Sequence, residues 1–118
     1  MAHPFRVIIR RRGKTEKRAF GTLDEALDDL ETELRAAATV ARRAPRPERA
    51  LGRDYEPGER VVVRGELRGP GRLRAGVDVR GDGSAQAYTG VVRRRLVEPG
   101  ERGDAWTALR ARLQPDAR

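Results

Sequence analysis

Apolar and polar residues alternate along the first segment of the chain that has a regular pattern. The apolar set is Phe5, Val7 and Ile9. A period of two residues is typical of a β-strand with one buried face. Gly13 and Lys14 mark a turn, after which residues 15–20 are predicted to return as a second strand. Residues 5–20 are therefore predicted to form a β-hairpin.

The next segment changes to the spacing of an amphipathic helix. Its apolar stripe is Leu23, Ala26, Leu27, Leu30, Leu34, Ala37 and Ala41. Thr22 and Glu25 have the spacing of a capping box, in which the hydroxyl of the first residue accepts the amide of the second. Pro45 and Pro47 end the pattern, because proline removes a helical hydrogen bond. We expect a helix over residues 22–43.

The second half of the chain predicts a meander and a short helix. Residues 44–59 hold three prolines and few apolar residues, which indicates a connecting loop. Residues 60–97 predict three strands, separated by glycine-containing turns at 69–71 and 81–83. A second helix is predicted over residues 104–114, with one side formed by Trp106, Leu109 and Leu113.

These elements follow one another in the order ββα-βββα. We expect an α+β fold in which an antiparallel sheet of about five strands carries the long helix on one face. A length of 118 residues fits a single small domain over residues 1–118. Only 37% of the residues are apolar, and many of these are alanine, so the predicted core is thin.

The composition excludes several kinds of site. The chain has no cysteine, which excludes disulfides and thiolate metal sites. His3 is the only histidine and Ser84 the only serine, and neither has the partners that metal binding or nucleophilic catalysis needs. We therefore expect a protein that is not an enzyme, with no catalytic residues, no metal and no cofactor. No apolar run has the length of a membrane span or of a signal peptide, which predicts a cytoplasmic protein without membrane contact.

The net charge of +8 is the strongest compositional signal. All but two of the 26 basic residues are arginine, the exceptions being Lys14 and Lys17. A GC-rich codon pool explains why arginine replaces lysine. It does not explain the excess of positive charge, because aspartate also has GC-rich codons. The excess favours polyanionic partners.

Strand alternation predicts where many of the arginines lie. If the apolar positions of the strands face the long helix, the alternate positions lie on the opposite face of the sheet. Nine arginines are predicted there: Arg6, Arg10 and Arg12 from the first strand, Arg60, Arg64 and Arg68 from the third, and Arg72, Arg74 and Arg80 from the fourth. Arg93 and Arg95 join them if Tyr88, Val92 and Leu96 point towards the helix.

An arginine-rich sheet face is suited to contact with phosphate groups. A guanidinium group forms two parallel hydrogen bonds to phosphate oxygens, and the release of counterions drives binding. The chain has few aromatic residues to stack on unpaired bases, so duplex or structured DNA or RNA fits better than a single strand. The preferred interpretation is a nucleic-acid-binding module that contacts the phosphate backbone.

Two alternatives stay open at this level. In the first, the arginines only solvate the sheet and pair with Glu66 and Asp78, and the C-terminal helix covers part of this face over Ile8 and Val62. The second starts from residues 21–34, which hold six acids and no base and lie between basic segments. Such charge blocks meet within one fold or across an interface, which would make the protein a homodimer or an adaptor domain without a nucleic-acid role.

Overall fold

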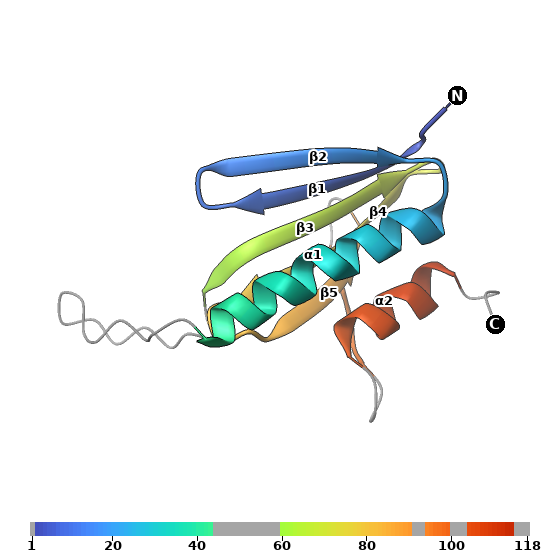
Figure 1. The fold of residues 1–118 in the computed structure, drawn as a ribbon. Coiled ribbons are helices and arrows are strands. Elements are labelled where there is room, and N and C mark those ends of the chain that lie inside the picture. The colour runs from blue at the N-terminus through green and yellow to red at the C-terminus, as the bar shows by residue number, and fades with distance from the viewer. Residues whose placement is uncertain (1, 44–59, 91–93, 100–103, 115–118) are drawn as a thin grey trace.

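An antiparallel sheet of six strands carries two helices on one of its faces (Figure 1). The computed structural model describes residues 2–43, 60–90, 94–99 and 104–114. The strands are β1 (Phe5–Arg11), β2 (Lys14–Phe20), β3 (Val61–Gly69), β4 (Leu73–Arg80), β5 (Ala85–Thr89) and β6 (Arg95–Val97). The helices are α1 (Leu23–Arg43) and α2 (Ala105–Leu113). The expected α+β class is confirmed.

The sheet has one strand more than the sequence predicts. The segment 85–97 forms two strands, because β5 ends at Thr89 and Gly90 follows with a φ of +99°. A positive φ of this size favours glycine and turns the chain out of the strand direction. The order across the sheet is β2-β1-β3-β4-β5-β6. The predicted loop 44–59 lies outside the described residues.

The strand order follows from the composition of the first hairpin. In β1 three consecutive residues, Val7, Ile8 and Ile9, are buried, whereas β2 has no buried residue. A strand with few apolar residues and several charges suits the edge of a sheet, where it discourages pairing with other chains. β3 therefore pairs with β1 on the other side, and β1 becomes an inner strand.

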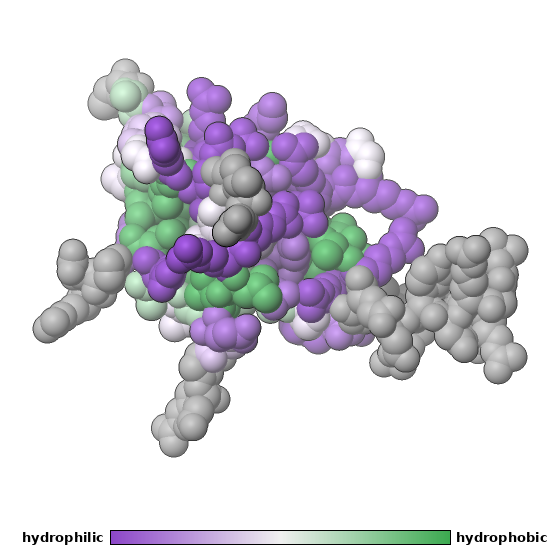
Figure 2. Space-filling model, turned by 180° about the vertical axis from the view of Figure 1, so that it is seen from behind, coloured by the Kyte–Doolittle hydropathy of each residue, from purple (hydrophilic) through white to green (hydrophobic). Residues whose placement is uncertain are grey.

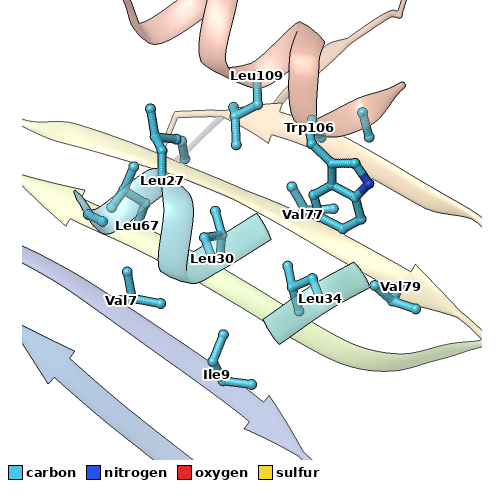
Figure 3. Packing of buried hydrophobic residues seen from close by; sticks show 14 of the residues in the cluster. Val7, Ile9, Leu27, Leu30, Leu34, Leu67, Val77, Val79, Trp106 and Leu109 are labelled. Carbon is cyan, nitrogen blue, oxygen red and sulfur yellow. The ribbon is translucent and has the colours of Figure 1, made fainter. Parts of the chain in front are cut away.

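The core lies between the sheet and the two helices (Figure 3). Its largest members include Val7, Ile9, Leu67, Val77 and Val79 from the sheet, Leu27, Leu30 and Leu34 from α1, and Trp106 and Leu109 from α2. α1 crosses the sheet closely at Gly65, where an added Cβ would lie 2.5 Å from Leu34 Cδ1 and 2.6 Å from Leu30 Cδ1. The absence of a side chain at this position of β3 sets the depth of the helix. Val61, expected in this core, is 37% exposed beside a register shift at the start of β3.

Both helices begin at a side-chain cap. The hydroxyl of Thr22 accepts the Glu25 amide at 3.2 Å and donates to the Glu25 carboxylate at 2.9 Å, which confirms the capping pair. Asp104 caps α2 by accepting the Thr107 amide at 2.8 Å. Each contact satisfies an amide that would otherwise lack a partner in the first helical turn.

α2 packs beside α1, on the same face of the sheet. Trp106 is 7% exposed and Leu109 is 1% exposed, and both belong to the core that α1 also covers. The alternative in which this helix covers Ile8 and Val62 is therefore wrong. Its apolar side packs with Leu27, Leu30 and the β5 strand rather than crossing to the other side of the sheet. No helix within the described ranges is long and apolar enough to cross a membrane.

Candidate nucleic-acid interface

The face of the sheet turned away from α1 and α2 is called the distal face below. Figure 2 views the molecule from behind Figure 1, and hydrophilic residues cover most of this side, with smaller apolar patches between them. The strand register arranges its side chains in rows that cross the sheet. One row is Arg6, Arg68 and Arg74. The next is Lys17, Ile8, Glu66, Gly76, Tyr88 and Leu96, and the third is Arg10, Arg64, Asp78 and Gln86.

The structure brings together most, but not all, of the arginines that strand alternation predicts on this face. Strand positions on the distal face are held by Arg6, Arg10, Arg64, Arg68, Arg74 and Arg80. Arg12 lies in the turn after β1 and Arg60 just before β3, where both line a shallow hollow together with Arg10 and Arg64. Arg72 lies in the turn before β4, with a φ of +63°.

Of the two arginines whose placement was conditional, Arg95 does not lie on the distal face. Tyr88 and Leu96 are paired in register and point to the distal face, not towards the helices. Arg95 is paired with Thr89 instead, so alternation places it on the helix side of the sheet. Arg93 lies outside the described residues.

Sequence reasoning missed Lys17, Tyr88 and Arg94 as members of the distal face. The guanidinium carbon of Arg94 lies 4.5 Å from the centre of the Tyr88 ring, a cation–π contact. The missed signal is the alternation in β5, where the small apolar residues Ala85 and Ala87 take the core positions. The larger Tyr88 then has to occupy the other face.

Two carboxylates on the distal face each bind two arginines. Glu66 lies 3.0 Å from Arg10 and 3.2 Å from Arg68. Asp78 lies 2.9 Å from Arg64 and 3.8 Å from Arg94. These pairs confirm the expected pairing with Glu66 and Asp78, and the hydrogen bond to Asp78 raises the pKa of Arg64 above its ordinary value.

The pairing leaves a large positive excess on this face. Within the described ranges, the basic side chains on this face are Arg6, Arg10, Lys17, Arg64, Arg68, Arg74, Arg80 and Arg94, against the two carboxylates of Glu66 and Asp78. Among the described residues, no carboxylate lies within 4.0 Å of Arg6, Arg74 or Lys17. Arg80 donates to the amide oxygen of Gln86 at 2.7 Å and has no carboxylate within 4.0 Å among the described residues, although Asp82 in the next turn interacts with its charge.

Five of the six acids of α1, in contrast, are paired with arginines on the helix side, the exception being Glu25. Arg110 of α2 bonds Asp24 and Asp28, both at 2.6 Å. Arg18 of β2 lies 2.9 Å from Asp29. Glu33 and Glu31 are bound by arginines as well, Glu33 by Arg11 and Arg18 and Glu31 by Arg35. The opposite charge blocks of the sequence therefore meet within the fold.

Two apolar side chains on the distal face are also buried. Ile8 is 4% exposed although it points away from the core cluster. Its register partners are Lys17 and Glu66, whose aliphatic stems can lie along apolar neighbours while their charged ends reach water. Tyr88 is 5% exposed, and its burial raises the pKa of its phenol.

Within the described ranges, no three His, Asp or Glu side chains lie close enough together to hold a metal ion. Comparison of the chain with family models, with curated proteins and with solved structures gives no match.

Proposed function

We propose that this protein is a non-enzymatic module that binds DNA or RNA by contacting the phosphate backbone with the distal face. The observation that carries the proposal is the charge arrangement of this face, where eight basic side chains surround two carboxylates. Guanidinium groups in register on neighbouring strands, which are spaced about 4.8 Å apart, present several donors to adjacent phosphate oxygens.

The distribution of charge supports a polyanion as the partner. Most acids of α1 are already paired with arginines on the helix side, so they do not offset the distal face locally. At physiological salt, charges more than about 8 Å apart are largely screened from each other. A polyanion near the distal face therefore experiences mainly the positive excess of that face.

The stacking of Arg94 on Tyr88 favours contact with the phosphate backbone of a nucleic acid over contact with its bases. Tyr88 is the aromatic residue that the described strands place on this face, and Arg94 covers its ring. Single-strand binding relies on exposed aromatic rings on which bases stack. A duplex or structured nucleic acid, bound through phosphates with little sequence preference, fits this surface better.

A salt titration tests the proposal. We expect a short fluorescein-labelled DNA duplex, and the RNA duplex of the same sequence, to bind at low salt. The logarithm of the affinity should fall linearly with the logarithm of salt concentration, because counterions are released. No binding at low ionic strength, or an affinity insensitive to salt, would overturn the proposal.

Paired variants separate the distal face from net charge alone. Arg6→Gln combined with Arg74→Gln should weaken DNA binding and reduce the salt slope by about 0.9 for each lost phosphate contact. Arg43→Gln combined with Arg112→Gln removes the same charge from exposed helix positions and should have a much smaller effect. Equal losses in the two double variants would show that this face is not the interface. A stable dimer in light scattering, combined with no DNA binding, would favour the homodimer alternative instead.

A further inference from the structure

The distal face contains a hollow of about 200 Å³ with three guanidinium groups around it. The charged and aromatic side chains that line it are Glu66, Arg68, Arg74, Tyr88 and Arg94. The three arginines come from β3, from β4 and from the segment that precedes β6. A site built from three separate segments is fixed by the fold and not by one stretch of sequence.

Arg68 and Arg74 are held close together without enough negative charge between them. They are direct partners in the β3–β4 register, and Arg6 is the partner of Arg68 on the other side. Like charges directly opposite each other destabilise an antiparallel pair. Glu66 offsets part of this charge, but it also binds Arg10 and therefore serves two arginines. An anion between Arg68 and Arg74 would relieve the remaining repulsion.

Arg68 also has a buried donor with no acceptor in the described structure. Its Nε is shielded from solvent and makes no hydrogen bond, while its Nη2 donates to Glu66 at 3.2 Å. A buried donor without an acceptor destabilises the folded state. A shift of the Arg68 side chain that exposes this atom to an oxygen of a bound group would satisfy the donor.

The third arginine is held in place by Tyr88. The Tyr88 ring lies over Gly76, where any Cβ would collide with the ring, so glycine is required at this position of β4. Arg94 stacks on the ring at 4.5 Å and lies 3.8 Å from Asp78, too far for a strong hydrogen bond. The guanidinium of Arg94 is thus oriented mainly by the ring and keeps donors for a ligand.

We infer that this hollow binds a single phosphate group, with Arg68 and Arg74 as the main donors and Arg94 closing one side. Phosphate oxygens accept paired hydrogen bonds from guanidinium groups, and the three positive charges, offset by the one negative charge of Glu66, match a doubly charged phosphate better than a halide. The inference rests on the proposed function, because it names the position on the distal face where one backbone phosphate binds. An isolated phosphate ion shares this chemistry, so the hollow can be tested without nucleic acid.

The first experiment titrates inorganic phosphate into the intact protein and follows the arginine Nε–H signals by NMR. We expect a saturable shift of the Arg68 and Arg74 signals that sodium chloride of equal ionic strength does not reproduce. Arg74→Gln should weaken phosphate binding about tenfold, the loss of roughly one charge-assisted hydrogen bond. The control Arg80→Gln removes the same charge from the same strand and face, outside the hollow, and should change the affinity less than about twofold.

The second experiment measures duplex DNA binding by the same variants, so that failure of either proposal can be recognised. Two results would overturn the phosphate site even if the protein binds DNA. One is the absence of a saturable shift with phosphate, and the other is an equal weakening of phosphate binding by Arg74→Gln and Arg80→Gln. If Arg74→Gln weakens phosphate binding but the protein does not bind DNA at low salt, the hollow is a site for small phosphate groups and the proposed function is overturned. A larger loss of DNA affinity in Arg74→Gln than in Arg80→Gln would support both.

Discussion

Arg68 of β3 and Arg74 of β4 lie directly opposite each other on the distal face. Of these two arginines, only Arg68 has a carboxylate of the described residues within 4.0 Å. An arrangement of this kind does not help the sheet to fold, because neighbouring guanidinium groups repel each other. An anion bound between the two guanidinium groups would offset this repulsion. The relationship therefore connects the stability of the sheet with the proposed binding surface.

Replacing Arg74 should make the protein more stable. Arg74→Gln removes one of two like charges held opposite each other, so we expect the free energy of unfolding to rise by about 0.5 kcal/mol at low salt. The gain should disappear at high salt, where the repulsion is screened. Urea unfolding at two salt concentrations measures both effects. Arg80→Gln should give no gain, because Arg80 lies opposite Val61 and donates to Gln86. An Arg74→Gln protein that is less stable than the wild type at low salt would contradict this account.

Replacing Glu66 should change stability and DNA affinity in opposite directions. Glu66 is 18% exposed in its side chain and bonds Arg10 and Arg68, so Glu66→Gln should lower the free energy of unfolding by about 1 kcal/mol. The same change removes a negative charge from the distal face and should tighten DNA binding under the proposed function.

The control for this variant is Glu31→Gln, which removes a carboxylate from the helix side. Glu31 pairs with Arg35 one helical turn away, so its loss should cost about 0.3 to 0.5 kcal/mol. DNA affinity should change little. If Glu31→Gln tightens binding as much as Glu66→Gln, net charge and not the distal face determines the affinity.

The close approach of α1 to the sheet predicts a strong effect at Gly65. In Gly65→Ala the new methyl group would overlap Leu30 and Leu34, so we expect a loss of about 1 to 3 kcal/mol in thermal or urea unfolding. Leu34→Ala alone leaves a cavity and also destabilises. The double variant should lose less than the sum of the two single losses, because the added methyl enters the vacated space. Additive losses would show that the helix does not depend on this contact.

The cap of α2 predicts a dependence of stability on acidic pH. Burial alone would raise the pKa of Asp104, but hydrogen bonds from the Thr107 amide and from Arg35 outweigh it and hold this pKa below the ordinary value of 3.8. The folded protein therefore binds this proton more weakly than the unfolded chain. The contribution of the carboxylate to stability is complete above the ordinary pKa and is lost as pH falls below it.

Asp104→Asn isolates this contribution, because asparagine still caps a helix but has no charge. We expect the variant to be less stable than the wild type by under about 1 kcal/mol at neutral pH, since the Asp104 side chain is 43% exposed. The difference should stay constant down to about pH 5 and shrink as pH falls through the range near 4 and below. A difference that does not change with pH would contradict the assignment.

Local patterns in the sequence predict the elements of this fold well. The capping pair of Thr22 and Glu25 and the apolar stripe of α1 are properties of neighbouring residues, and both are confirmed. The break between β5 and β6 was missed, because the adjacent valines at 91 and 92 hide the alternation of that segment. The place of α2 could not be predicted, since its apolar side could have covered either face of the sheet.

The candidate site was predictable only in part. Alternation within β1, β3 and β4 placed their strand arginines correctly, because each depends on its own strand. The rows that cross the sheet depend on the register between strands far apart in sequence. The stack of Arg94 on Tyr88 depends on a glycine of another strand, Gly76, and no local pattern indicates such a contact.

The internal pairing of the α1 carboxylates has a consequence for the way the molecule meets its surroundings. With most of the α1 acids bonded to arginines on one side and a net positive surface on the other, the described part of the molecule has its positive excess on one side of the sheet. A polyanion would rotate such a molecule during approach so that the strands, and not the helices, arrive first. Long-range orientation of this kind raises the fraction of productive collisions, and salt weakens it.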